Sequence, residues 1–556
     1  MPRVEAISAF LREPHPRWDR RDTAIAIAAV VAILVRWGDR ARYFLTWDAH
    51  MFALALERYD VNALRPHAPG YPVYVALGKL ANLVFADANE AFIAVSMLGS
   101  AGGAVLTYTI GRRLFDRATA LGATVLLLAS PQVHIHAMTT NSYAAELTFA
   151  TLVALAALWC RDNPRPRRVL ALAVAFGVAV GVRQSLGLFL APMVAWAALR
   201  PPWGWRAQAR RLGPGLLAGA AVGLAWFIPM VVASGGLAVW RRANALQSQV
   251  VFEHPVWRDG PSMLLVNLDR MQLYLRWEAM VVLPIVGVLA AVGLGLHLAR
   301  GGRLPRWSAL PSTTRTTIAF LLVWALPAWI FYLAVYSGYG NGPSGYTLLL
   351  LPPMTLAAAW IALASLRRFP WPRPASALAA TVALAVAVTG LVSHAHDAAD
   401  IDYRVNDAWA ENWSHLRDGF PPENTSIVTA YNFAHLWFYE PDYHVYEYRP
   451  AGKAVGEVPD FLLIQESYQH EATPDWYDEI ADHRTPLNHT LPAGTDVLVL
   501  FDFQLAGENG GDRAVKPEIP VREAFLPNGW RILVVDVTPD RPLLEDYFTL
   551  EDIGTG

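Results

Sequence analysis

The sequence contains very little cysteine and few charged residues. Cys160 is the single cysteine among 556 residues, which excludes an intrachain disulfide and a metal site built from several thiolates. Charged residues make up 17% of the chain, against about 25% in soluble domains. The formal net charge is −2, so there is no electrostatic basis for binding nucleic acid. Hydrophobic residues, by contrast, make up 54% of the chain and form long blocks, which excludes a wholly soluble enzyme, a fibrous protein and a disordered chain.

Hydrophobic residues form long blocks between Thr23 and Val392. A helix needs about 20 mainly apolar residues to cross a bilayer, and blocks of this kind predict eleven spans. The fifth and sixth are short, but losing both would not change the orientation of the others, because this pair begins and ends on the same side. The expected spans are 22–37, 91–111, 118–133, 144–160, 169–182, 185–199, 213–233, 279–299, 316–336, 346–366 and 375–393.

Arginine in the short connections predicts the orientation of these spans, because cytoplasmic loops of membrane proteins are enriched in basic residues. Connections 134–143 and 337–345 contain no Lys or Arg and are expected outside. The N-terminus is therefore predicted to be cytoplasmic, with two long outside loops at 38–90 and 234–278. The arginine-bearing connections lie at 112–117, 161–168, 200–211, 300–306 and 367–373.

The first span has an alternative interpretation as a cleaved signal peptide, since its apolar core is short and Arg36 follows it. The residues before it are numerous, contain proline and carry both signs of charge, and no small-residue cleavage site follows. These features favour a retained membrane anchor. With an odd number of spans, the chain is expected to end outside the cytoplasm.

The sequence after His394 has the composition of a soluble protein. Strand-like runs occur at 426–430, 496–501 and 530–535, with helical patterns at 405–417 and 432–439. We expect a helical transmembrane domain at 1–395 and an extracytoplasmic α/β domain at 396–556. No Walker or Rossmann glycine motif is found.

The richest polar cluster follows the first span. Asp48 lies about one turn beyond the span, where a carboxylate can meet a substrate at the interface. Farther on, three prolines and a glycine in 65–72 forbid a continuous helix and instead predict a turn that presents His67 and Tyr71 near the membrane face. An alternative is that Asp48 is a solvated loop carboxylate or caps a helix beginning near Ala49, and spacing alone does not decide between these interpretations.

Two more candidates lie at the ends of expected spans. Glu146 begins an apolar run, where a carboxylate requires a partner. Arg183 joins two short apolar runs, and its planar guanidinium suits a phosphate oxygen; alternatively it extends to the interface or pairs with Glu146. His134 and His136 form only a weak metal-binding signal. The glycine-rich loop 337–345 suits either close approach to a ligand or a plain connection.

The layout resembles the GT-C superfamily of membrane glycosyltransferases, which includes protein O-mannosyltransferases and lipid A aminoarabinose transferases. The shared features are a first span, a long outside loop with an acidic residue near its start, many helices and an outer soluble domain. Trp47–Phe52 and His67–Tyr74 look like segments of a bacterial GT-C-like family, as does Ser130-Pro131 followed by Tyr143 and Glu146. The paired Asp-Glu of the mannosyltransferases is absent, which leaves the acceptor class open.

The resemblance implies that a sugar is moved from a polyprenyl-phosphate donor to a lipid, glycan or protein acceptor at the outer face of the cytoplasmic membrane. It makes Asp48 the catalytic base, with His67 and Tyr71 shaping the pocket. Arg183 is then the phosphate ligand and Glu146 a second polar contact. Some members use a divalent metal, although the sequence shows no convincing metal cluster. The alternatives are a transporter of lipid-linked saccharides, for which internal repeats are expected and not found, and a non-catalytic cell-envelope scaffold.

Overall fold

The computed structural model divides the chain into two compact units, which are described separately below. The helical unit comprises Met1–Ala41, Pro69–Val232 and Asn244–Arg404, and the mixed unit comprises Arg42–Ala68, Ala233–Ala243 and Val405–Gly556. The structure describes residues 18–163, 165–199, 205–252, 254–301, 307–336, 345–367, 373–399, 412–413, 415–429, 433–449, 460–463, 490–501, 515–526, 529 and 531–548.

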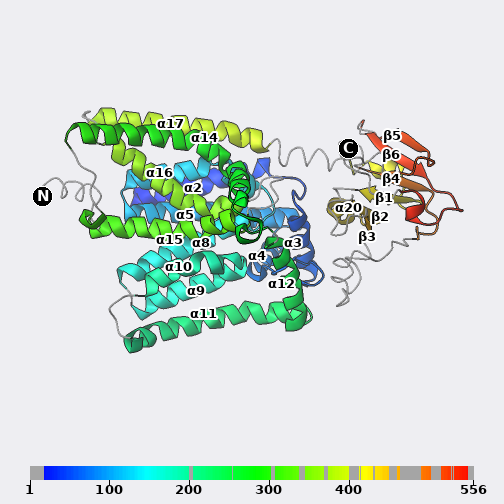
Figure 1. Ribbon diagram of the computed structural model, residues 1–556, viewed down its shortest axis with the longest axis horizontal. Coiled ribbons are helices and arrows are strands. Elements are labelled where there is room, and N and C mark those ends of the chain that lie inside the picture. The colour runs from blue at the N-terminus through cyan, green and yellow to red at the C-terminus, as the bar shows by residue number, and fades with distance from the viewer. Residues whose placement is uncertain are drawn as a thin grey trace. The chain divides into compact units, whose positions relative to one another are not determined.

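Long helices make up almost all of the helical unit (Figure 1). They are α2 (Arg20–Leu34), α4 (Pro72–Asn82), α5 (Ala88–Leu114), α6 (Arg117–Ala129), α7 (Pro131–Met138), α8 (Tyr143–Asp162), α9 (Pro166–Val182), α10 (Ser185–Ala198), α11 (Trp205–Ala233), α14 (Ser262–Ala299), α15 (Ser312–Ala334), α16 (Leu351–Leu366) and α17 (Arg373–Ala399), with the short η1 (Val35–Asp39), α13 (Val256–Asp259), η2 (Trp307–Ala309) and η3 (Gly345–Leu350). A further helix, α12 (Leu237–Val251), is divided in sequence between the units: its residues up to Ala243 belong to the mixed unit and the rest to the helical unit.

Each of the eleven expected spans coincides with one or more of these helices. In the described part of the chain, seven helices are long and apolar enough to cross a membrane. The pair α6 and α7, bent by 58° at Ser130, adds an eighth if it counts as one span. The bend occurs because Pro131 cannot continue the hydrogen-bond pattern of α6 and instead begins α7. The other three, α2, α9 and α10, have 15, 17 and 14 residues, so they are shorter than a typical span.

Helix α5 packs closely against α8 because glycine lines its contact face. A Cβ atom added at Gly99 would lie 2.6 Å from the carbonyl oxygen of Ala144, so no larger residue fits there. Thr148 reinforces the contact by donating a hydrogen bond to the Gly99 carbonyl. This close packing fixes the position of the first turn of α8, which contains Glu146.

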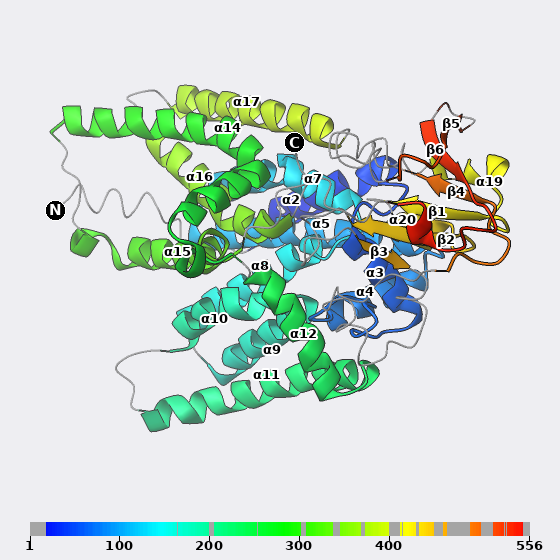
Figure 2. The ribbon, with the colours of Figure 1, turned by 45° about the vertical axis from the view of Figure 1, so that its right-hand side comes forward.

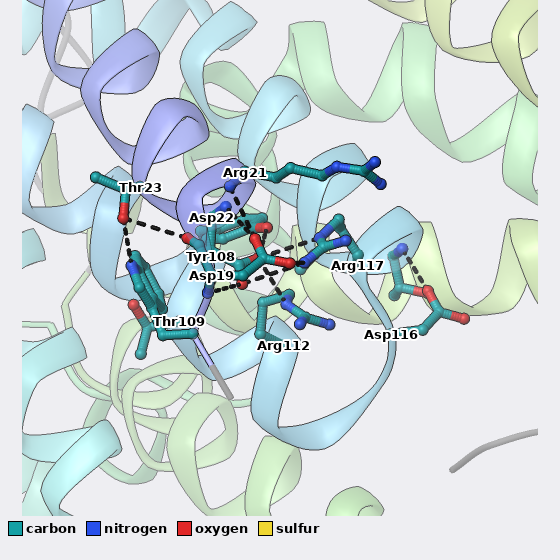
Figure 3. Close-up of polar contacts among 12 residues, drawn as sticks. Asp19, Arg21, Asp22, Thr23, Tyr108, Thr109, Arg112, Asp116 and Arg117 are labelled. Atoms are coloured by element: carbon teal, nitrogen blue, oxygen red, sulfur yellow. Dashed lines mark hydrogen bonds and ion pairs between the residues drawn. The ribbon is translucent and has the colours of Figure 1, made fainter. Parts of the chain in front are cut away.

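A buried network of charges ties the start of α2 to α5 and α6 (Figure 3). Asp19 caps α2, and Asp22 in the first turn completes a capping box. The fully buried Asp22 carboxylate accepts hydrogen bonds from Tyr108 at 2.6 Å, Arg112 at 3.0 Å and Arg117 at 3.1 Å. These bonds join the short α2 to the rest of the bundle.

The mixed unit is built on a six-stranded sheet, seen from two sides in Figures 1 and 2. The strand order is β3-β2-β1-β4-β6-β5, in which β1 is parallel to both β2 and β4 and the remaining pairs are antiparallel. The strands are β1 (Thr425–Thr429), β2 (His444–Arg449), β3 (Asp460–Leu463), β4 (Val497–Leu500), β5 (Val521–Phe525) and β6 (Arg531–Asp536).

Three of these strands, β1, β4 and β6, occupy the runs expected from the sequence, and the expected helix at 432–439 is α20 (Phe433–Tyr439). Much of the helix expected at 405–417 lies outside the described residues, although α19 (Leu416–Gly419) begins within its last part. Apolar residues pack on both faces of the sheet, and one face is covered by Trp413 and Leu436. The mixed unit also contains α3 (Trp47–Glu57), which packs against α20.

Candidate active site

Asp48 lies in the first turn of α3 but does not cap this helix. The cap is Thr46, whose extended backbone (φ −129°, ψ 156°) directs its hydroxyl to the Ala49 amide at 3.3 Å. The Asp48 side chain is 43% exposed. Because Thr46 caps the helix, the Asp48 carboxylate is not used for capping and is available for other partners.

His67 is the neighbour that the structure gives to Asp48. Its Nδ1 atom lies 3.7 Å from Oδ1 of Asp48, which is too long for a direct hydrogen bond but close enough for a charge interaction. The His67 ring is buried beside Trp47 and Phe52, with ring centroids 6.1 and 5.7 Å apart. The histidine is thus held in place while the carboxylate stays accessible.

A second aspartate of this segment, Asp60, has a structural role. Its Oδ1 atom accepts hydrogen bonds from the backbone amides of Asn62 at 3.1 Å and Ala63 at 3.3 Å. Its Oδ2 atom lies 3.2 Å from the Arg58 guanidinium. The next amide, that of Val61, donates to Ser234 at 3.1 Å. Asp60 therefore shapes the turn that follows α3.

A second polar cluster, in the helical unit, surrounds Arg183. The guanidinium donates to Oε2 of the buried Glu146 at 3.2 Å, which is the pairing that the sequence offered as an alternative for Arg183. It also lies over the rings of Tyr143 and Tyr346, 4.4 and 5.2 Å from their centroids, and interacts electrostatically with Tyr71. Oε1 of Glu146 has no hydrogen-bond partner among the described residues.

The peptide around Tyr71 turns sharply before α4. Gly70 has φ +121° and Tyr71 has φ +48°, which is rare for a residue with a side chain. Pro72 then begins α4. This is the turn predicted from the prolines and glycine, and it brings Tyr71 toward Arg183. The five candidates thus form two clusters: Asp48 with His67 in the mixed unit, and Tyr71, Glu146 and Arg183 in the helical unit.

The two histidines considered as metal ligands have different neighbours. His134 accepts a hydrogen bond from Arg36 at 3.2 Å, whereas His136 is buried with its ring 5.2 Å from that of Tyr143. Among the described residues, no group of three or more His, Cys, Asp or Glu side chains could hold a metal ion. Of the glycine-rich loop, residues 337–344 lie outside the described part of the chain.

Sequence reasoning missed one buried carboxylate, Glu278 in α14. Its side chain accepts a hydrogen bond from Ser130 at the break between α6 and α7, and both residues are buried. The available signal was an acidic residue directly before an apolar run, the same signal that identified Glu146. The Asp19-x-x-Asp22 pattern before α2 is a capping signature that was also overlooked.

Comparison with known proteins gives one family match. Residues 66–232 match the family model described as "Dolichyl-phosphate-mannose-protein mannosyltransferase". The matched range includes four of the five candidate residues, His67, Tyr71, Glu146 and Arg183. No curated protein matches this sequence.

Solved structures resemble the whole chain. ArnT from Cupriavidus metallidurans bound to undecaprenyl phosphate is 14% identical with a TM-score of 0.55, covering 93% of this chain and 98% of that one. The apo form of the same protein gives 14% identity and a TM-score of 0.51, with coverage of 92% and 97%. The oligosaccharyltransferase of Archaeoglobus fulgidus, tethered with an acceptor peptide, has 11% identity, a TM-score of 0.48 and coverage of 93% and 74%.

Proposed function

We propose that this chain is a GT-C membrane glycosyltransferase that transfers a sugar from a polyprenyl-phosphate donor to an acceptor at the outer face of the cytoplasmic membrane. The family match over residues 66–232 and the similarity of fold to ArnT support this proposal. The solved ArnT holds undecaprenyl phosphate, which is the leaving group of such a donor. Sugar nucleotides are confined to the cytoplasm, so a donor used outside it has to arrive attached to a lipid.

The observation that carries the proposal is the accessibility of Asp48. Its carboxylate lies at a helix start that is already capped by Thr46, and it has a buried histidine beside it. A general base needs these two properties, a free oxygen and a fixed position. Asp60 lacks the free oxygen, because its carboxylate is bonded within its own turn and to Arg58.

In the proposed reaction, Asp48 accepts the proton of the acceptor hydroxyl as its oxygen attacks the anomeric carbon of the donor sugar. A new glycosidic C–O bond forms on one face of the sugar while the bond to the phosphate oxygen breaks on the other. The leaving group is polyprenyl phosphate, and the configuration is inverted. His67 orients the carboxylate. We assign no step to a metal.

Arg183 is proposed to bind the donor phosphate, with Tyr71 shaping the pocket beside it. The guanidinium carries five N–H donors, so the bond from Nη1 to Glu146 leaves capacity for phosphate oxygens. Glu146 and the rings of Tyr143 and Tyr346 hold the guanidinium in one orientation. A fixed arginine suits a phosphate better than a flexible one, because less entropy is lost on binding.

The proposal is tested by following the leaving group. Purified protein in liposomes is mixed with polyprenyl-phosphate sugars and membrane acceptors, and free polyprenyl phosphate is measured by mass spectrometry. Acceptor-dependent release is expected. A transporter would move the donor across the bilayer without releasing polyprenyl phosphate, and that result would contradict the proposal. Mass spectrometry of envelope glycans from a deletion strain then identifies the sugar and the acceptor.

The proposed orientation is tested by thiol labelling in whole cells. Ser262 and Ser312 are both exposed at the start of a helix, and the arginine pattern places the first outside and the second inside. In a Cys160→Ala background, Ser262→Cys should react with an impermeant thiol reagent and Ser312→Cys should not. The reverse result would overturn the orientation.

A further inference from the structure

The segment that leads into α3 is bound to the C-terminal part of the mixed unit through one residue. The Phe44 amide donates to the Tyr439 hydroxyl at 3.0 Å, and the Phe44 carbonyl accepts from Nε2 of His435 at 2.7 Å. Both backbone groups of Phe44 are therefore occupied by side chains of α20. These partners lie 395 and 391 residues away in the sequence.

Aromatic rings surround these two hydrogen bonds. The Phe44 ring contacts Phe438 edge to face at 5.0 Å, and Tyr43 contacts Tyr439 at 5.2 Å. Trp413 stacks on Tyr439 at 5.7 Å. Phe44, His435 and Trp413 are buried. Since buried backbone groups lose their water partners, the bonds to His435 and Tyr439 are costly to remove.

His50 continues the connection from this cluster to the start of α3. It is fully buried, its ring lies 4.3 Å from that of His435, and its Nδ1 atom donates to the Thr46 carbonyl at 2.9 Å. Thr46 is the cap of the helix, and Asp48 follows two residues later. The position of the Asp48 backbone is therefore determined by contacts that begin on α20.

We propose that His435 and Tyr439 are positioning residues that hold Asp48 in place through the backbone of Phe44. This inference rests on the proposed function, in which Asp48 is the base. It gives the C-terminal part of the chain a role in the reaction itself. A misplacement of about 1 Å can cost about 100-fold in rate, so small changes in this contact should be visible in kcat.

Two tyrosines of the same unit provide a matched test. Tyr439→Phe removes the acceptor for the Phe44 amide, whereas Tyr443→Phe removes a buried hydroxyl that donates instead to the Phe420 carbonyl. In the full-length protein we expect Tyr439→Phe to lower kcat about 10- to 100-fold with the donor KM unchanged. Tyr443→Phe should keep kcat within about twofold. Equal losses in both variants, or no loss in either, would overturn the proposal.

His435 provides a second test, with rescue by a conservative variant. Gln can place its amide N–H near the position of Nε2, so His435→Gln should retain most of kcat, whereas His435→Leu should lose it. A Leu variant as active as the Gln variant would contradict the role of this hydrogen bond. If His435→Leu fails to fold, the comparison of Tyr439 with Tyr443 still decides.

Hydrogen exchange provides a readout that does not depend on transfer. Backbone amides of residues 44–50 should exchange faster in Tyr439→Phe than in Tyr443→Phe. Equal exchange rates in the two variants would overturn the positioning role even if Asp48 is the base. Faster exchange in Tyr439→Phe, combined with full activity of Asp48→Asn, would instead show that the contact exists but that the proposed function of Asp48 is wrong.

Discussion

Two aspartates lie in the first turn of a helix in this protein and have opposite surroundings. Asp22 lies in the first turn of α2, behind the cap Asp19, and Asp48 lies in the first turn of α3, behind the cap Thr46. Asp22 is fully buried and receives hydrogen bonds from three side chains. Asp48 is half-exposed and has His67 at 3.7 Å. Both lie in a first turn, at the third helical residue for Asp22 and at the second for Asp48, and their tertiary contacts differ.

The comparison teaches how a polar residue at a helix start is assigned a role. A carboxylate whose oxygens are all occupied stabilises the fold, and removing it leaves buried cations unpaired. A carboxylate beside an independent cap is not required by its helix. Under the proposed function, substitution should therefore affect rate at Asp48 and stability at Asp22.

The largest effect is expected at Asp48. Asn has nearly the same size but cannot accept a proton, and loss of a general base costs about 10²- to 10⁴-fold in rate. Asp48→Asn should therefore lower transfer by about that factor while its thermal unfolding stays close to that of the wild type. Steady-state release of polyprenyl phosphate provides the measurement.

Asp60→Asn is the matched control for this substitution. Its Oδ1 atom can still accept from the amides of Asn62 and Ala63, so its activity should remain within a few fold. Normal transfer by Asp48→Asn with an inactive Asp60→Asn would move the base to Asp60. Normal transfer by both would remove these carboxylates from the mechanism.

A loss of stability is expected at Asp22. Breaking a buried ion pair by removing one partner costs about 3–5 kcal/mol, because Arg112 and Arg117 would lose a shared acceptor. Asp22→Ala should therefore lower the thermal midpoint of the purified protein in detergent by several degrees. Asp162→Ala breaks the more exposed pair with Arg113 and should cost about 0–1 kcal/mol. Equal shifts of the thermal midpoint in Asp22→Ala and Asp162→Ala would mean that the network around Asp22 is not stabilising.

Much of the fold could be predicted from the sequence. All eleven expected spans are helical and three expected strands are present. The length and hydrophobic pattern of an apolar block or a β-branched run are enough to indicate its secondary structure. The bend at Ser130 was not predicted, although Pro131 signals it. The inclusion of residues 42–68 in the same compact unit as the C-terminal sheet could not be predicted, since it depends on contacts such as that of Phe44 with Tyr439.

The candidate site could be predicted only as individual residues. The sequence indicated Asp48, His67, Tyr71, Glu146 and Arg183, and the pairing of Arg183 with Glu146 was one of the stated alternatives. It could not show that Thr46 takes the capping role or that Asp60 closes a turn, because both depend on backbone geometry. The catalytic and binding roles of these residues are predictions, which the substitutions at Asp48 and Arg183 test.

The stability of the mixed unit is expected to depend on pH, because two of its histidines, His50 and His435, are buried. Burial lowers the pKa of His435 to about 4, against about 6.5 when unfolded. Burial and the neighbouring His435 also lower the pKa of His50 well below its usual value. Between these pH values the unfolded state binds more protons, so stability falls as pH decreases from about 6.5 toward 4.

The size of this pH effect can be measured by hydrogen exchange in strands β1 and β4. Lowering the pH from 7.5 to 5 should reduce stability by roughly 2 kcal/mol through His435, and His50 adds to the loss in the same direction. His435→Gln should remove its share of the pH dependence. A variant with the same dependence as the wild type would show that His435 is protonated without cost in the folded state.

The smallest effect is expected at Arg183. Like Asp22 it belongs to a buried ion pair, here with Glu146, but like Asp48 it retains groups that can contact a ligand. Arg183→Lys keeps the charge and loses the planar fork, so the donor KM should rise about tenfold, equivalent to about 1.4 kcal/mol, with a smaller fall in kcat. Arg161→Lys is the control, because Arg161 also lies over an aromatic ring, that of Trp196, and donates to the backbone carbonyls of Trp196 and Leu199. Its donor KM should not change. If Arg183→Lys and the charge-balanced Arg183→Ala/Glu146→Gln both keep the wild-type donor KM, then Arg183 serves Glu146 alone and belongs with the structural network of Asp22.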